Sequence, residues 1–227
     1  EAQAPRDIVE LKENAVIYID RKAVRGPGEL TPNYEELLQE GMEGIISYIE
    51  KKKSDYSLSK ANHYPKIAYL NAMITAARGM IILGQRYREE ALRLASQEKN
   101  ALRRKELEQI ANVFLQIPAR PARTFHEALQ FVYLYHSSIF MEQNAASYNL
   151  GRIDQYLYPY YKTDIDAGRL TEEEAQELLD CAWIKLAEPC LFQDGVTAEY
   201  ANGYTMFQNV CAGGINSNGQ DAVNELS

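Results

Sequence analysis

The sequence predicts a mainly α-helical chain, a helical shell with one or two β-strands. Apolar residues recur at helical spacing in long segments such as Leu37–Ile49,. The segments Thr124–Glu127 and Thr171–Glu174 have the Thr-x-x-Glu pattern of a helix capping box,. One β-rich run, Tyr204–Cys211, lies near the end of the sequence,.

The first long helix is expected to follow a loop at Arg25–Glu29, where two glycines flank a proline,. Before it, the apolar segment Ile8–Ile19 has no clear type. Thr31 is expected to cap the helix, with Pro32 in the first turn. Lys51–Lys53 suit the negative end of the helix dipole. One face is expected to be buried through Leu37, Leu38, Met42, Ile45, Ile46 and Ile49.

A longer helix is expected over Pro65–Ser96, and another over Lys99–Gln116. Glycine inside a helix costs about 1 kcal/mol relative to alanine, so the small residues of the longer helix predict close helix contacts. These residues are Ala72, Ala76, Ala77, Gly79 and Gly84. Residues 118–122 are expected to be extended, because residues before proline avoid the helical region.

Three further helices are expected, over Thr124–Met141, Arg152–Ala167 and Thr171–Ala187. Pro159 predicts a kink or break in the second of them, and Gly168 suits its C-cap. Pro189 ends the third helix. In both capping boxes the glutamate is expected to bond back to the threonine backbone.

The C-terminal part has residue types that favour strands and turns over helices. Tyr204–Cys211 predicts a strand, and Asn216–Gly219 predicts a turn,. Asp221 has the character of an N-cap for a helix over Ala222–Ser227. Such a helix stops after about two turns, so we expect the sequence to be a piece of a longer protein.

The composition limits the partners. The 227 residues are 46% hydrophobic, enough for one domain or a large part of one, and carry a net charge of −8,. This acidity disfavours nucleic acids and anionic membranes, and no apolar run approaches the roughly 18 residues of a membrane span. No signal peptide is recognised at the start, and three cysteines without metal spacing suit a reducing, cytoplasmic compartment,.

Motifs for metal or phosphate binding are weak. His63, His126 and His136 lie on separate segments without an HExxH pattern, which favours packing or surface roles,. No GxGxxG or GxxxxGK[ST] motif occurs. The polar string from Glu142 to Asn149 is either a solvated loop or the lining of a polar pocket. After it, Arg152 and Asp154 are expected to form a buried structural ion pair.

Several strings of the sequence resemble the glycyl radical enzymes of the pyruvate formate-lyase superfamily, in their dehydratase and lyase branch. The strings are GPGELTPNYEELLQEGMEGI, ILGQRYREEALRLA, PARTFHEALQ, GRIDQYLYPYYKTDIDAGRLTEEEAQELLDCAWIKL and GYTMFQNVCAGGINSNGQDAVNELS. They occur in the family's order and cover nearly the whole chain.

The resemblance implies a parent enzyme three to four times longer, with a ten-stranded α/β barrel inside a helical shell. Residues 1–227 would form a partial domain, with 1–200 as shell and 201–227 as the first barrel strand and the start of a helix. The radical glycine and the thiyl cysteine would lie outside this chain, since neither an RVxGY-like nor a GCVE-like string occurs. No catalytic residue or metal ligand is therefore assigned, Cys211 included, and the chain alone is expected to be inactive.

By the same resemblance, a thiyl radical abstracts hydrogen from a small polar substrate, and a neighbouring C–O, C–N or C–S bond breaks. An activase using S-adenosylmethionine and an iron–sulfur cluster would install the glycyl radical, so the chain binds no cofactor itself. The expected partners are this activase, the remainder of the parent chain and a second copy in a homodimer.

Two pocket positions carry over by the resemblance. Related diol dehydratases have a histidine where this sequence has Glu29, and a His-Ser pair where it has Ala146-Ser147. Glu29 would accept from a hydroxyl or face an ammonium group, or else is an exposed loop carboxylate. The substrate-binding candidates are Glu29 and Ser147 first, then Asn144 and Gln143.

Other functions stay open. One is a C–C lyase closer to pyruvate formate-lyase, and another is a non-catalytic helical binding or regulatory relative. A helical scaffold without a ligand is the simplest reading of the composition alone.

Overall fold

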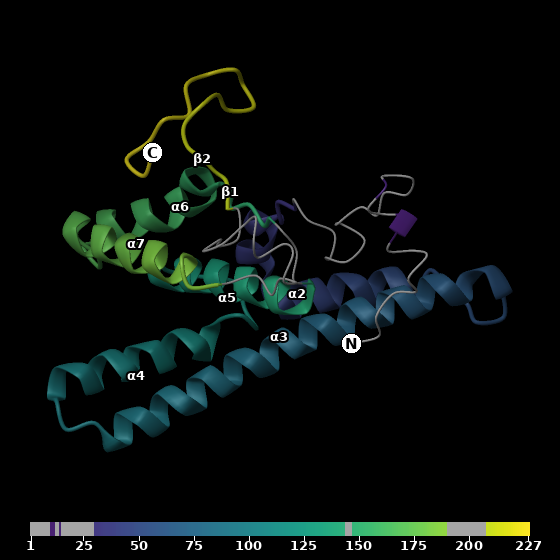
Figure 1. The fold of residues 1–227 in the computed structure, drawn as a ribbon, viewed down its shortest axis with the longest axis horizontal. Helices are drawn as coiled ribbons and strands as arrows, with labels where there is room; N and C mark the ends of the chain where they lie inside the picture. The colour runs from purple at the N-terminus through teal and green to yellow at the C-terminus, as the bar shows by residue number, and fades with distance from the viewer. Residues whose placement is uncertain (1–9, 12–13, 15–29, 144–146, 190–207) are drawn as a thin grey trace.

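A computed structural model of the chain describes residues 10–11, 14, 30–143, 147–189 and 208–227. The loop at Arg25–Glu29 and the segment Ile8–Ile19 fall almost entirely outside this part. The described residues are mainly helical, as expected (Figure 1). In order they form α2 (Tyr34–Lys53), a 3₁₀ turn η2 (Ala61–His63), α3 (Tyr64–Gln97), α4 (Ala101–Gln116), α5 (Phe125–Gln143), β1 (Gly151–Arg152), α6 (Ile153–Asp166), α7 (Glu172–Leu186) and β2 (Val210–Cys211).

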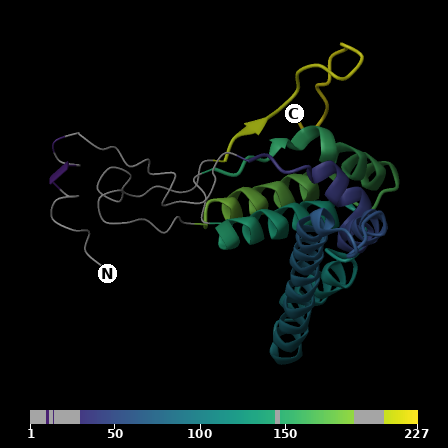
Figure 2. The same cartoon turned by 90° about the vertical axis from the view of Figure 1, so that its right-hand side faces the viewer.

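The helices form two groups. The long α3 and the returning α4 make a hairpin that projects away from α5, α6 and α7, which lie together near the strand pair (Figures 1 and 2). Helix α2 packs against α3 and α5. The core lies between these groups and is built largely from side chains of α2, α5 and α6, including the fully buried Leu38, Phe125 and Phe131. Burial of these side chains holds the two groups together.

Helix α3 corrects one expectation from the sequence. Residues 61–97 contain an 18-residue window of mean hydropathy 1.4, long and apolar enough to cross a membrane by length and composition. The sequence criterion of an uninterrupted apolar run does not detect this window, because polar residues lie between its apolar ones. Length and composition are weak evidence on their own, and α3 packs along α4 and α2.

Helix α2 begins later than expected and is broken inside. Its N-cap is Asn33 rather than Thr31, and the Asn33 side chain accepts from the Glu36 N–H. At Gly41 the backbone leaves the helix with φ 65°. The amide of Met42 then donates to the Pro118 carbonyl at 2.9 Å, and a Cβ on Gly41 would lie 2.5 Å from the Arg120 carbonyl carbon. Glycine therefore fits both the conformation and the close approach.

The segment after α4 begins as a turn, where the sequence predicts extended chain over residues 118–122. Residues 117–119 turn, with a cis bond between Ile117 and Pro118. The Ala122 amide donates to the Leu38 carbonyl at 2.9 Å. Docking on the broken helix α2 thus shapes the residues after Pro118. Ile117, which precedes this proline, is extended with φ −95° and ψ 155°, as the proline preference predicts,.

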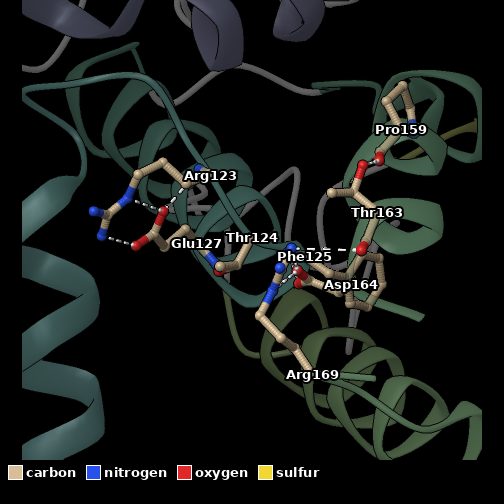
Figure 3. Close-up of polar contacts among 8 residues, drawn as sticks. All are labelled: Arg123, Thr124, Phe125, Glu127, Pro159, Thr163, Asp164 and Arg169. Carbon is tan, nitrogen blue, oxygen red and sulfur yellow. Dashed lines mark hydrogen bonds and ion pairs between the residues drawn. The ribbon is translucent and has the colours of Figure 1, made fainter. Parts of the chain in front are cut away.

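The start of α5 keeps half of its expected capping box (Figure 3). The Glu127 amide donates to Thr124 Oγ1 at 3.2 Å, but the Glu127 carboxylate accepts from the Arg123 amide at 2.7 Å instead of the Thr124 amide. The Arg123 guanidinium adds an ion pair to Glu127 at 2.7 Å. The competing guanidinium explains the difference, because charge-assisted bonds are stronger.

A second carboxylate secures the same helix end from α6 (Figure 3). Asp164 accepts from the Phe125 amide at 2.8 Å and pairs with Arg169 at 2.7 Å. Asp164 therefore joins α5 to α6. Helix α6 runs through Pro159 without a break, and Gly168 follows its C-cap with φ 63° as expected. The Thr171 capping box of α7 is complete.

The C-terminal residues are not helical, so the helix expected over Ala222–Ser227 is wrong. Asp221 accepts from the Val223 amide, but Asp221 also forms an antiparallel bridge with Ile215. Only Val210 and Cys211 of the expected strand Tyr204–Cys211 are described as strand, and residues 204–207 lie outside the described part. The turn at Asn216–Gly219 is confirmed.

The small residues of α3 differ in their surroundings. A Cβ on Gly84 would lie 2.3 Å from Pro118 Cδ, whereas a Cβ on Gly79 would meet nothing within 4 Å. Ala77 is buried, but Ala72, Ala76 and Gly79 are exposed. The expected close contacts therefore hold at Ala77 and Gly84, and are wrong at the other three positions.

We expect Gly84→Ala and Gly79→Ala to have opposite effects on stability. Gly84→Ala adds a methyl group where α3 meets Pro118, and should lower the free energy of unfolding by about 1–3 kcal/mol. Gly79→Ala should raise it by up to about 1 kcal/mol through helix propensity alone. Urea unfolding of both variants measures this, and equal effects would contradict the close contact.

Candidate substrate-binding site

Three chain segments meet at the strand pair, where the sequence places its polar string. Strands β1 and β2 are parallel, with Gly151 opposite Val210. Before β1, Leu30 forms a parallel bridge with Tyr148, and the Leu30 amide donates to the Ser147 carbonyl at 3.2 Å. Residues 147–150 therefore lie between Leu30 on one side and residues 209–210 on the other.

Ser147 is held by this arrangement. Its hydroxyl donates to Asn149 Oδ1 at 3.1 Å, and the same oxygen accepts from the Asn209 amide at 3.0 Å. Ser147 is only 3% exposed. The Leu150 amide also donates to the Asn209 carbonyl at 3.0 Å. The hydroxyl is thus fixed by two segments that are far apart in the sequence.

Gln143 is the last residue of α5 and bonds to Tyr148. The Tyr148 hydroxyl donates to Gln143 Oε1 at 3.1 Å. Burial, with a smaller effect of the Glu142 carboxylate, raises the pKa of Tyr148 to about 12. Tyr148 therefore stays a neutral hydrogen-bond donor at physiological pH, and it orients the amide of Gln143.

The four candidate residues have different outcomes. Gln143 and Ser147 both lie beside Tyr148, one before and one after the gap in the described chain. Asn144 and Glu29 lie outside the described residues, although Leu30, the neighbour of Glu29, bonds directly to Ser147. The substrate-binding roles of all four residues stay predictions.

The sequence reasoning missed Asn149, Asn209 and His136 as parts of this site. Asn149 was within the polar string, so its residue type was a usable signal. Asn209 lies 60 residues from Asn149 along the chain. Of the packing and surface roles left open for His136, the packing role holds, since the side chain is 0% exposed. No local pattern predicts its partners Tyr34 and Gln208.

Arg152 and Asp154 support the segment after β2 instead of pairing directly with each other. Arg152 donates to the carbonyls of Gly213 and Ile215 at 2.7 and 2.9 Å. Asp154 Oδ2 accepts from the Gly213 amide at 2.6 Å. The burial and structural role expected for Asp154 are confirmed, at 1% exposure. The expected direct pair is corrected: both side chains bond to residues 213–215.

Within the described part of the chain, no group of three or more His, Cys, Asp or Glu side chains is placed to hold a metal ion. Cys181 and Cys211 are free and exposed. Ser147, Asn149 and Gln143 instead offer hydroxyl and amide groups. Such groups bind a small polar molecule through hydrogen bonds.

The described residues thus form helices beside a parallel strand pair, with polar side chains at its edge. The whole sequence matches one protein family. The model of the family described as "PFL-like: Pyruvate formate lyase-like" matches residues 1–227. The chain belongs to the pyruvate formate lyase-like family.

Its relatives are glycyl radical dehydratases and lyases. Trans-4-hydroxy-L-proline dehydratase of Clostridioides difficile is 36% identical over 206 residues, covering 89% of this chain and 26% of the relative. Isethionate sulfite-lyase of Oleidesulfovibrio alaskensis is 32% identical over 198 residues, covering 86% and 24%. A solved structure on 1,2-propanediol dehydration in Roseburia inulinivorans superposes with a TM-score of 0.91 at 33% identity, over 98% of this chain and 26% of that one. The chain therefore spans about a quarter of the length of these relatives.

Proposed function

We propose that this chain forms part of the substrate pocket of a glycyl radical lyase or dehydratase, with Ser147 as its main polar contact. The observation that carries the proposal is the convergence of Ser147, Asn149 and Asn209 at the parallel strand pair. The radical chemistry belongs to the parent enzyme and an activase that uses S-adenosylmethionine. The residues described here orient the substrate and exclude water.

The Ser147 hydroxyl already donates its proton to Asn149. Its oxygen can therefore only accept from a ligand. Trans-4-hydroxyproline, isethionate and 1,2-propanediol, the compounds in the names of the relatives, all carry a hydroxyl group that can donate. We therefore propose a small hydroxylated substrate, cleaved at a C–O, C–N or C–S bond next to the abstracted hydrogen.

The experiment is turnover by the full-length enzyme, activated without oxygen by its activase. The three compounds are supplied separately, and products are identified by mass spectrometry. We expect product from at least one hydroxylated compound. A protein that carries the glycyl radical signal in electron paramagnetic resonance, yet turns over none of the three, would contradict the proposed substrate class.

A C–C lyase is the second candidate. The glycyl radical subunit of 4-hydroxyphenylacetate decarboxylase from Clostridioides difficile is 29% identical to this chain over 226 residues. Adding 4-hydroxyphenylacetate to the same assay separates the two candidates, because its decarboxylation releases carbon dioxide.

A further inference from the structure

His136 lies at the centre of a hydrogen-bonded chain that crosses the core toward the candidate site. Tyr34 Oη lies 2.9 Å from His136 Nδ1, and His136 Nε2 lies 2.8 Å from Gln208 Oε1. The other end of the Gln208 side chain donates from Nε2 to the Leu186 carbonyl at 2.6 Å. His136 and Tyr34 are 0% and 1% exposed, so water does not compete for these bonds.

The direction of each bond follows from the partners. A carbonyl cannot donate, so the Leu186 oxygen requires the amide nitrogen of Gln208 to face it,. The Gln208 oxygen then faces His136 and can only accept, so His136 Nε2 carries a proton. In a neutral ring Nδ1 is an acceptor, so the Tyr34 hydroxyl donates to it,.

Several features keep the ring neutral. Burial lowers the pKa of His136, while the bond to Gln208 acts in the opposite direction and is weaker. The titratable side chains that face this cluster are tyrosines: Tyr34, Tyr148 with its ring centroid 6.2 Å from that of His136, and Tyr135 and Tyr156, whose rings contact Tyr34. Burial raises the pKa of each of them. Two carboxylates act on these tyrosines: Glu142 on Tyr135 and Tyr148, and Asp154 on Tyr156.

The chain of bonds continues from Gln208 into the candidate site. The next residue, Asn209, donates its amide to Asn149 Oδ1, which also receives the Ser147 proton. The Asn209 carbonyl accepts from the Leu150 amide. Holding Gln208 therefore fixes where Asn209 meets Asn149, and so which way the Ser147 hydroxyl points.

We propose that His136, as the Nε2–H tautomer, is a positioning residue that fixes Gln208 and Asn209 and thereby keeps Ser147 as a hydrogen-bond acceptor. The statement about the substrate rests on the proposed function. The tautomer and the link from Gln208 to Leu150 do not, so they can be tested without turnover.

The tautomer is measured on the full-length enzyme labelled with ¹⁵N-histidine, by correlating ring nitrogens with ring protons, and loss of one set of signals in His136→Gln assigns it. We expect His136 to show a protonated Nε2 and a bare Nδ1, and to become protonated only at a pH below the ordinary histidine pKa. A protonated Nδ1, or titration near the ordinary value of about 6.5, would overturn the proposal.

Two variants test the link to the site. Gln208→Ala removes the acceptor of His136 and should speed hydrogen exchange of the Leu150 amide about tenfold, as loss of one net hydrogen bond implies. Tyr34→Phe removes the bond at the other end of the ring and should change that exchange by less than about twofold. Unchanged exchange in Gln208→Ala would show that the ring does not position this segment. Neither result depends on which substrate the enzyme takes.

Discussion

Asp154→Ala is expected to cost about 3–4 kcal/mol of unfolding free energy, the range for loss of a buried, hydrogen-bonded carboxylate. Asp154 is 1% exposed. Its Oδ2 accepts from the Gly213 amide and the Ser227 hydroxyl, each at 2.6 Å, and from Gln155 Nε2 at 2.9 Å. Alanine removes the acceptor of these three donors. Each buried donor left without an acceptor lowers the free energy of unfolding by about 1–3 kcal/mol.

Asp154→Asn separates charge from shape. An amide oxygen can take the place of Oδ2, but its NH₂ then occupies the place of Oδ1, which is buried and has no hydrogen-bond partner among the described residues. The asparagine variant should therefore also lose stability, by about 1–3 kcal/mol.

Asp166→Ala is the matched control on the same helix, because Asp166 is exposed and its ion pair among the described residues is with the exposed Lys162. Its effect should stay within about 0.5 kcal/mol.

The stabilisation by Asp154 should depend on pH. Burial would raise the pKa of Asp154, but the bonds from Ser227, Gly213 and Gln155 and the nearby Arg152 together lower it. Because the pKa of Asp154 is lower in the folded state, its charge stabilises the protein at pH values above the unfolded pKa of about 3.9. This stabilisation is lost as the pH falls through the folded-state pKa. The free energies of unfolding of wild type and Asp154→Ala, measured in urea, should therefore approach each other as the pH falls below about 4. A constant difference down to pH 2 would contradict a charged Asp154.

Ser147→Ala is expected to lower kcat/KM of the full-length enzyme by about 10- to 100-fold, with little change in stability. A single lost substrate contact accounts for about tenfold, and misplacement of the reacting carbon accounts for the rest. Removal of the hydroxyl also removes the proton donated to Asn149 Oδ1, but that oxygen keeps the Asn209 amide. The folded frame should therefore survive the change.

Ser138→Ala is the matched control for Ser147→Ala. Its hydroxyl donates to the Leu134 carbonyl within α5 at 2.7 Å, away from the strand pair. Steady-state kinetics of both variants should show an effect at Ser147 and less than about twofold change at Ser138. Equal kinetics for Ser147→Ala and wild type would remove Ser147 from the pocket.

Local sequence signals predicted most of the helices. The Thr171–Glu174 box is complete, and Glu174 forms no ion pair with a described cation, whereas Arg123 diverts Glu127 from its box. The expected helix after Asp221 failed for another reason. Ser227 bonds to Asp154, 73 residues away, and Asn224 bonds to the carbonyl of the same residue, so tertiary contacts override the cap,.

The candidate site was predictable only in part. Gln143 and Ser147 lie in one polar string, and residue type alone marked them. Asn209 orients Ser147, and the neighbouring Gln208 is held by His136, which bonds to Tyr34. Gln208 lies 72 residues from His136 in the sequence, and His136 lies 102 residues from Tyr34. Sequence patterns report spacing along one element, and these contacts join different elements.

The most direct test is a crystal structure of the full-length enzyme with bound substrate, solved without oxygen. The central claim is that Ser147 accepts a hydrogen bond from the substrate. We expect a substrate hydroxyl within about 3 Å of Ser147 Oγ, with the Ser147 proton still directed to Asn149. A substrate that contacts none of residues 143–149 would contradict this role for the strand pair.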